Sequence, residues 1–350
     1  MLGMKEPKHI QLPREVWVGR GVLSRLSEVC RSLGLRGSAT IVADRTTYEI
    51  AGRRVERDLT RTGIAASHLL TDEASMATVE RVRSASRDAS FLIGVGGGRP
   101  IDVAKLASFY DGKPFISVPT AASHDGIASS RASVRGGKSP VSIQTHAPIA
   151  IIADTSIIRK APYRLLAAGC GDLIANITAV RDWQLARDLK GEPYSEYAAT
   201  LSLVSAQLIL ENAGVIRRYT EESVRKVVKS LISSGVAMAI AGSSRPASGS
   251  EHMFSHALDM VAPRPALHGE QCGVGAIMMA YLQGEDWEAL KSALRTIGAP
   301  TTAKELGIPA RYIVKALTIA HKIRPDRFTV LGEGLSRRVA ERLAKVTGVI

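Results

Sequence analysis

The apolar pattern of this chain changes character near residue 160, and that change constrains the fold more than any other feature. Before it, short apolar runs alternate with helical segments. The runs cover 38–44, 90–95, 115–118 and 149–154. Short strands separated by helices are typical of a parallel sheet covered on both faces. We therefore predict an α/β, nucleotide-binding-like domain over residues 1–160.

After residue 160, alanine- and leucine-rich segments follow one another with prolines between them. This pattern predicts an all-α domain over residues 161–350. Its helices are expected at 164–189, 195–215, 222–241, 250–261, 270–282 and 334–346. Because ligand sites of two-domain enzymes often lie between the domains, we expect the site in that cleft.

Composition excludes several other classes of protein. Hydrophobic residues make up 45% of the 350, enough to offset chain entropy on folding, so we expect a folded chain. No apolar run reaches the roughly 18 residues of a membrane-spanning helix, and the N-terminus lacks the apolar centre of a signal peptide. Three dispersed cysteines do not suggest a disulfide framework. We predict a soluble, cytoplasmic protein without membrane insertion.

The formal net charge of +13 favours anionic partners, either nucleic acid or a small anionic substrate. The basic residues cluster only in pairs and aromatic residues are 5%, which does not favour nucleic-acid binding. A basic nucleic-acid-binding protein is the alternative from a different class, and it predicts steeply salt-dependent binding. Only two Asn and six Gln occur, and this scarcity of heat-labile amides indicates a hot source organism.

A glycine-rich loop, Gly94 to Gly98, stands between a predicted strand and a predicted helix. Glycines let the backbone approach a phosphate closely, and the helix N-terminus supplies free amide groups and a positive dipole end. A turn that needs glycine only for its backbone is the alternative. The spacing departs from G-x-G-x-x-G, so we interpret the loop as a pyrophosphate-binding loop but not an ordinary dinucleotide fingerprint.

A second loop, Pro119 to Gly126, also follows a predicted strand and carries Asp125. We interpret it as a ligand loop at the carboxyl end of the sheet, against the alternative of a surface loop that Asp125 caps. Residues 127–145 then interrupt the alternation of strands and helices. They predict a β-hairpin with Gly136 and Gly137 in its turn.

Three of the eight histidines, His252, His256 and His268, fall within 17 residues. His252 and His256 are four apart and share one face if their segment is helical. With Asp172 they offer imidazoles and a carboxylate, a common ligand set for catalytic zinc. A hydrogen-bonded helix pair without metal is the alternative. Cys272 and a second cysteine near Asp172 lack the paired spacing of a closed zinc site, so we interpret both as buried small residues or neighbours of the site.

The segments GVGGGRPID, PTAASHDGIASS, GCGDLIAN, SGSEHMFSHALD and LHGEQCGVG, in this order, resemble archaeal sn-glycerol-1-phosphate dehydrogenases. That family belongs with glycerol dehydrogenase, iron-type alcohol dehydrogenases and 3-dehydroquinate synthase. The resemblance covers nearly the whole chain. It implies a Rossmann-like α/β domain followed by an all-α domain. It also implies zinc-dependent reduction of dihydroxyacetone phosphate by NAD(P)H to sn-glycerol-1-phosphate, the backbone of archaeal ether lipids.

The resemblance assigns roles to individual residues. One zinc ion per subunit would be held by Asp172, His252 and His268. Substrate would contact Asp125, His256 and also Asp172, with Asp125 and His256 as candidate catalytic residues. NAD or NADP would contact Gly98, Arg99, Pro100, Ile101, Asp102, Thr120, Ala121, Ala122, Ser123 and Ser129. Asp44 ends a predicted strand where these enzymes approach the adenosine ribose, and a carboxylate there favours NAD.

The substrate phosphate needs cationic or amide donors, and Arg131 and Lys138 of the hairpin region are candidates. Two alternatives share the fold: a glycerol dehydrogenase acting on unphosphorylated polyols, and a dehydroquinate synthase-type lyase that uses and regenerates NAD. The expected partners are a small phosphorylated triose as substrate and further copies of the chain, since relatives in this family are usually homo-oligomers. We do not expect a nucleic-acid partner.

Overall fold

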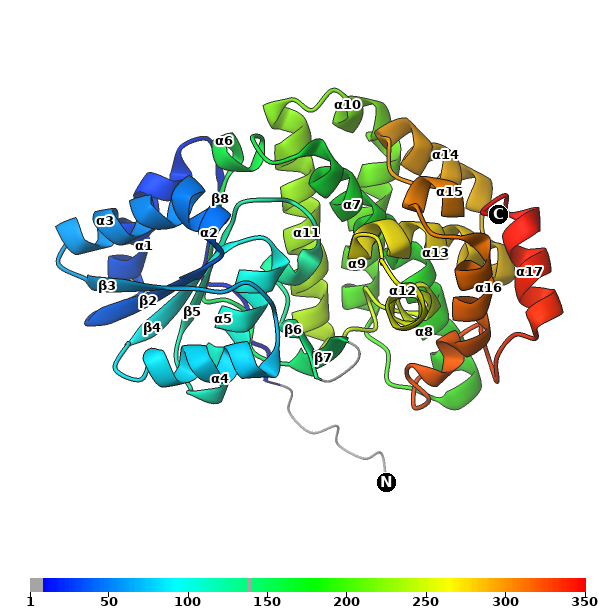
Figure 1. The fold of residues 1–350 in the computed structure, drawn as a ribbon, viewed down its shortest axis with the longest axis horizontal. Helices are drawn as coiled ribbons and strands as arrows, with labels where there is room; N and C mark the ends of the chain where they lie inside the picture. Colours follow the sequence, from blue (N-terminus) through cyan, green and yellow to red (C-terminus); the bar gives the residue numbers. More distant parts are fainter. Residues whose placement is uncertain (1–8, 137–139) are drawn as a thin grey trace.

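A computed structural model of the protein describes residues 9–136 and 140–350. An α/β half and a helical half pack side by side (Figure 1). The α/β half is built on a six-stranded parallel sheet with the order β1-β8-β5-β4-β2-β3. Its strands are β1 (Glu15–Gly19), β2 (Ser38–Ala43), β3 (Ala65–Leu70), β4 (Phe91–Gly96), β5 (Phe115–Pro119) and β8 (Ala150–Asp154). The four predicted apolar runs are thus confirmed as β2, β4, β5 and β8.

Helices cover both faces of this sheet. Alternate residues of the strands point to opposite faces, so Ile41 and Ile93 pack toward one helix pair while Leu92 and Ile151 pack toward the other. The first pair is α1 (Leu26–Ser32) and α3 (Arg53–Arg61), and the second is α4 (Met76–Ala85) and α5 (Gly98–Tyr110). The apolar cluster on the α5 side continues without a break into the helical half.

The strand order reverses between β2 and β4. From β2 the chain passes to β3 at one edge, whereas from β4 it passes in the other direction to β5. Such a reversal opens a crevice at the carboxyl ends of the two strands, where doubly wound sheets bind ligands. Asp44 follows β2 and the glycine loop ends β4, so both stand at this crevice.

The predicted hairpin is confirmed. Strands β6 (Arg131–Arg135) and β7 (Pro140–Gln144) pair in antiparallel fashion, with Arg131 opposite Gln144. The hairpin contacts α5 and lies between it and the helical half (Figure 1). Gly136 directly follows β6, where the turn was predicted to begin. Gly137 and Lys138 lie outside the described residues.

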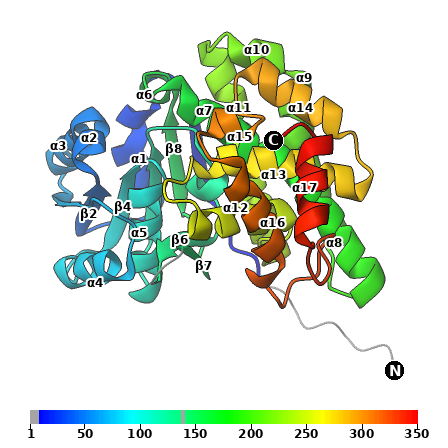
Figure 2. The ribbon, with the colours of Figure 1, turned by 45° about the vertical axis from the view of Figure 1, so that its right-hand side comes forward.

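The second half is helical, as predicted. Its longest helix is α11, and it stands between the sheet and the other helices (Figures 1 and 2). The short helix α6 (Thr155–Ile158) follows β8 and belongs to the first half. The helices after residue 160 are α7 (Tyr163–Ile174), α8 (Asn176–Lys190), α9 (Glu196–Glu211), α10 (Ala213–Arg217), α11 (Glu221–Ala241), α12 (Ser250–Val261), α13 (His268–Gln283), α14 (Trp287–Ile297), α15 (Ala303–Leu306), α16 (Ala310–Ile319) and α17 (Arg337–Val346). Among the described residues, no helix combines the length and the apolar character needed to cross a membrane.

Two predicted helices are divided. The segment expected at 164–189 forms α7 and α8, which meet at Ala175, and the segment at 195–215 forms α9 and α10, which meet at Asn212. At Asn212 the backbone leaves helical geometry, and the side-chain amide donates to the carbonyl of Leu208. Asparagine competes for backbone groups in this way and therefore favours helix ends.

Glycines bring α7 and α13 into backbone contact. A Cβ atom on Gly269 would lie 2.0 Å from the carbonyl oxygen of Ala168, and one on Gly171 would lie 2.3 Å from the carbonyl oxygen of Gly269. No side chain fits between backbones this close. The contact sets Asp172, near the end of α7, beside His268, the first residue of α13.

We predict that Gly269→Ala forces α7 and α13 apart. Overpacking of this kind costs about 1–3 kcal/mol, so both the melting temperature and the metal content of the purified protein should fall. Gly214→Ala is the matched control, because a Cβ atom at that position of α10 meets no atom within 4 Å. Equal melting temperatures and metal contents for the two variants would contradict the proposed role of the contact.

Candidate functional site

Four side chains from three helices converge between the two halves of the molecule. Asp172 of α7, His252 of α12, and His268 and Cys272 of α13 each offer a ligand atom, and these atoms lie within 4.8 Å of one another. The Nε2 atoms of His252 and His268 lie 3.6 and 3.7 Å from the same Oδ1 atom of Asp172. Zinc bonds of about 2.0–2.1 Å place tetrahedral donors about 3.4 Å apart. The group therefore fits one metal ion.

The ring of His252 is oriented by a buried carboxylate. Glu251 accepts a hydrogen bond of 2.8 Å from Nδ1 of His252, because a carboxylate can only accept. That bond leaves Nε2 free to face Asp172. Glu251 is itself held by the backbone N–H of Gly249 at 2.6 Å and by the hydroxyl of Thr178 at 2.9 Å. Metal-binding histidines are commonly oriented by such a carboxylate.

Asp172 links the ligand group to the second predicted loop. Its Oδ2 atom accepts a hydrogen bond of 3.0 Å from the backbone N–H of Asp125, the first residue of the short helix η3 (Asp125–Ile127). The side chain of Asp125 accepts a bond of 2.8 Å from the hydroxyl of Ser234 on α11. Burial, together with the nearby charge of Asp172, raises the pKa of Asp125 to about 7.

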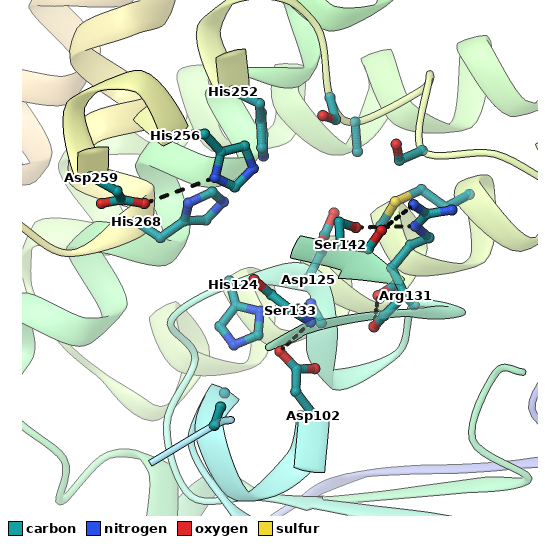
Figure 3. Close-up of a pocket in the computed structure, with 18 of the residues that line it drawn as sticks. Asp102, His124, Asp125, Arg131, Ser133, Ser142, His252, His256, Asp259 and His268 are labelled. Carbon is teal, nitrogen blue, oxygen red and sulfur yellow. Dashed lines mark hydrogen bonds and ion pairs between the residues drawn. The ribbon is translucent and has the colours of Figure 1, made fainter. Parts of the chain in front are cut away.

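His256 lies one turn beyond His252 on α12 and stands outside the group of converging ligand atoms. Its ring stacks against that of His268 with centroids 5.7 Å apart. Nδ1 of His256 lies 3.8 Å from a carboxylate oxygen of Asp259, whose other oxygen accepts a bond of 2.9 Å from Gln271. His256 is thus held at the pocket wall beside the ligands (Figure 3).

One pocket of about 270 Å³ joins the two halves of the molecule. Figure 3 shows the three histidines gathered at one side of it, with Asp102 and His124 at another. The predicted site residues that line it are Gly98, Arg99, Asp102, Asp125, Ser129, Arg131, His252, His256 and His268. Asp172 lies behind the histidines and its side chain is only 3% exposed. The pocket therefore brings the glycine loop and the potential metal ligands to one space.

The loops at the carboxyl ends of three strands are tied together. The backbone N–H of Thr120 donates to the carbonyl of Gly96 at 2.9 Å, and the hydroxyl of Thr47 donates to the carbonyl of Val95 at 3.0 Å. Asp44 caps the short helix α2 (Arg45–Thr47) by accepting from the N–H of Thr47 at 2.8 Å. Gly96 has φ of +153°, which glycine adopts readily. With α5 starting at Gly98, this arrangement suits a bound phosphate.

The other predicted cofactor residues do not line the pocket. Pro100 and Ile101 are buried in the first turn of α5, and Ile101 belongs to the core. The remaining ones are Asp44, Thr120, Ala121, Ala122 and Ser123. Those of the second loop follow β5 next to the glycine loop, to which the hydrogen bond between Thr120 and Gly96 joins them.

A fully buried ammonium group joins the helix that follows the glycine loop to the hairpin. Nζ of Lys105 on α5 donates to the carbonyls of Gly126 and Arg131 at 2.6 and 2.7 Å and contacts Asp102 at 3.3 Å. The second carboxylate oxygen of Asp102 accepts from the backbone N–H of Ser133 at 3.1 Å. Burial lowers the pKa of Lys105. The predicted cofactor residue Asp102 is thus also part of a buried structural network.

Comparisons with known proteins agree with this architecture. Residues 17–162 match the family model of iron-containing alcohol dehydrogenases. The structure of glycerol dehydrogenase from Schizosaccharomyces pombe superposes with a TM-score of 0.82 at 21% identity, covering 98% of this chain and 91% of that one. The fold is therefore that of the glycerol dehydrogenases and iron-containing alcohol dehydrogenases, which confirms the predicted fold class.

Relatives in sequence are closer still. Identity is 57% over 345 residues to "Glycerol-1-phosphate dehydrogenase [NAD(P)+]" of Methanosarcina acetivorans, covering 98% of this chain and 97% of the relative. It is 55% over 346 residues to the protein of the same name in Methanothermobacter thermautotrophicus, covering 99% and 100%. The chain belongs to the glycerol-1-phosphate dehydrogenase family, as the motifs predicted.

Several side chains that shape the site were not predicted from the sequence. Glu251 directly precedes a predicted ligand, and that adjacency was an available signal. By contrast, Cys272 was predicted as a buried small residue or a neighbour of the site, and this is confirmed, because it is buried with Sγ 3.6 Å from Nε2 of His268. Ser234 is one of many small residues on α11, and nothing local marks it.

We predict that Glu251→Gln weakens metal binding by about 10- to 100-fold, as loss of an orienting carboxylate typically does. Chelator competition on the purified protein measures this affinity. Glu222→Gln on α11 is the matched control, because the side chain of Glu222 is 69% exposed. Unchanged metal affinity in the Glu251 variant would mean that the carboxylate does not orient His252.

Proposed function

We propose that this protein is an NAD(P)-dependent and zinc-dependent sn-glycerol-1-phosphate dehydrogenase that reversibly reduces dihydroxyacetone phosphate. One observation carries the proposal: a single pocket has the glycine loop on one side and the Asp-His-His group on the other. The full-length relatedness to enzymes named for this reaction supports it. The product would be the backbone of archaeal ether lipids.

We assign the metal to Asp172, His252 and His268. Three protein ligands leave one position open, which is the arrangement of a catalytic zinc site. Cys272 would close that position, so we assign it as a neighbour of the site and not as a ligand. When bound, the metal polarises the substrate carbonyl and the nicotinamide supplies a hydride.

We assign the dinucleotide to the crevice at the carboxyl ends of β2, β4 and β5. The segment from Gly98 to Asp102 would lie against its pyrophosphate, with the backbone N–H groups of Gly98 and Arg99 as donors because Pro100 has none. Thr120 to Ser123 with Ser129 would complete its contacts. Asp44, held at the end of β2 by its bond to Thr47, would meet the adenosine ribose. A carboxylate there repels a 2′-phosphate, so we expect NADH to be favoured over NADPH.

We assign substrate orientation and proton transfer to Asp125 and His256. Asp125 is fixed from two sides, through its backbone by Asp172 and through its side chain by Ser234. Its other carboxylate oxygen is then available to accept from a substrate hydroxyl. His256 faces the pocket next to the metal ligands, where it can exchange a proton with the reacting oxygen through a hydrogen bond or one water.

A cytoplasmic location and a homo-oligomeric state are also proposed. All three cysteines are buried and unpaired, which agrees with a reducing compartment. The molar mass in solution, measured by light scattering, tests the oligomeric state.

We expect the purified enzyme to oxidise NADH with dihydroxyacetone phosphate and to form the sn-1 product. The value of kcat/KM for this substrate should exceed that for unphosphorylated dihydroxyacetone by about 100-fold, since charge-assisted hydrogen bonds to the phosphate contribute a few kcal/mol. Chiral analysis of the product and parallel NADH and NADPH assays complete the test. A preference for dihydroxyacetone favours a polyol dehydrogenase, and no net NADH consumption favours a lyase.

We expect His268→Ala to lose bound metal and activity while its NADH affinity stays close to that of the wild type. Cys272→Ala should keep its metal, because only three ligands are assigned. Elemental analysis of both variants measures metal content and separates zinc from iron, which two imidazoles and a carboxylate also bind. Undiminished metal in the His268 variant, or loss of metal in the Cys272 variant, would overturn the ligand assignment.

A further inference from the structure

One wall of the pocket carries arginines that form no ion pair with a described carboxylate. Arg131 of β6 and Arg324, which follows α16, both line the pocket, and Arg327 stands behind them. Within residues 9–136 and 140–350, none of the three forms an ion pair. Arg245 is also close to Arg327, but Glu192 pairs with it through two bonds. The wall therefore holds a surplus of positive charge.

Two of these arginines are held by neutral acceptors only. Arg131 donates to the hydroxyl and carbonyl of Ser142 at 3.1 and 2.8 Å and to Gln144 at 2.9 Å. Arg327 donates to the carbonyl of Ser248 at 2.6 Å and to the hydroxyl of Ser244 at 3.1 Å. These bonds fix both guanidinium groups in place without an ion pair, although the charge of Glu192 acts on Arg327 from a greater distance.

Arg324 differs from the other two. It lines the pocket and makes no side-chain hydrogen bond to any described residue. Its charge nevertheless acts on its neighbours: burial first, and then the charge of Arg324, lowers the pKa of Arg131 to about 10 and that of Arg327 to about 9. Like charges gathered without a counter-ion disfavour the folded state, so this cluster fits an anion that binds there.

The chemistry of the wall fits a phosphate. The hydroxyl-bearing residues Ser133, Ser142, Ser244 and Ser248 line the same pocket as Arg131 and Arg324. Guanidinium groups bind phosphate oxygens in pairs of parallel bonds, and serine hydroxyls add further donors. Figure 3 places Arg131 and Ser142 on the side of the pocket away from His256 and His268. A molecule held there by its phosphate can extend toward the metal ligands.

A third arginine that lines the pocket, Arg99, has a different position. Arg99 belongs to the glycine loop, and its guanidinium donates to the carbonyl of Asp72 at 2.9 Å. We assigned that loop to the dinucleotide. The dinucleotide assignment therefore uses Arg99 but not Arg131 or Arg324. Among the described residues that line the pocket, these two arginines remain available for another anion.

We propose that Arg324 and Arg131, positioned with the help of Arg327, bind the phosphate of the triose substrate and determine the preference for phosphorylated over unphosphorylated substrates. This inference rests on the proposed function, because it names the residues behind its substrate class. Arg131 was a candidate from the sequence. Arg324 and Arg327 come from a segment far along the chain and are new.

Arg324→Gln is the main test, because Arg324 makes no side-chain hydrogen bond within the described structure that its loss would break. We expect the KM for dihydroxyacetone phosphate to rise by about 10- to 100-fold, with a much smaller change in kcat. The ratio of kcat/KM for dihydroxyacetone phosphate to that for dihydroxyacetone should fall by the same factor. Arg324→Lys keeps the charge and should recover part of the loss.

Inorganic phosphate supplies a second measurement. It should inhibit the wild type in competition with dihydroxyacetone phosphate, and this inhibition should weaken in Arg324→Gln and Arg131→Gln. The matched control is Arg342→Gln on the exposed side of α17, which removes one positive charge away from the pocket and should behave as the wild type.

The outcomes separate the two proposals. If the wild type does not prefer dihydroxyacetone phosphate, the proposed function fails, and phosphate inhibition then tests the arginine site by itself. If the wild type has the preference and both Gln variants keep it, the arginine assignment is overturned. It is also overturned if Arg324→Gln raises the KM for NADPH but not that for the triose, because the bound phosphate is then the 2′-phosphate of the cofactor.

Discussion

The close backbone contact between α7 and α13 is the constraint on which the rest of the site depends. Because glycines leave no room for a side chain between these helices, Asp172 and His268 meet although nearly one hundred residues separate them. His252 then joins from α12, which packs along α13. From Asp172 the connection continues to Asp125 and on to Ser234 of α11. One carboxylate therefore contacts both the proposed metal ligands and the loop that carries Asp125.

Burial explains which parts of the fold could be predicted from the sequence. Strands covered on both faces are continuous apolar runs, so β2, β4, β5 and β8 were evident. Strands β1 and β3 lie at the edges, and the exposed side of β3 carries polar residues such as His68. Their apolar stretches are shorter, such as Val16 to Val18 in β1. The boundary at residue 160 stays a prediction, since one apolar cluster runs through both halves.

For the site, the sequence predicted what depends on residues close together along the chain, but not what depends on residues far apart along it. Spacing placed His252 and His256 on one helical face, yet only the packing of three helices decides that His256 stands outside the ligand group. The family resemblance had already separated their roles. Nothing in the sequence around Arg324 marks it as a site residue. Only the fold shows that it lines the same pocket as Arg131, which comes from a distant hairpin. Sequence motifs identify sites whose residues are close together along the chain. Arg131 and Arg324 are far apart along the chain and come together only in the folded structure.

The buried ammonium group of Lys105 has a consequence for selectivity by size. It ties α5, which begins at the glycine loop, to the carbonyl of Arg131 and to the helix η3 that starts with Asp125. These parts cannot move independently without exposing or breaking buried hydrogen bonds. If the phosphate is fixed at one end of the pocket and the reacting carbon at the other, the distance between the two positions is also fixed. The pocket would then select its substrate by length as well as by charge.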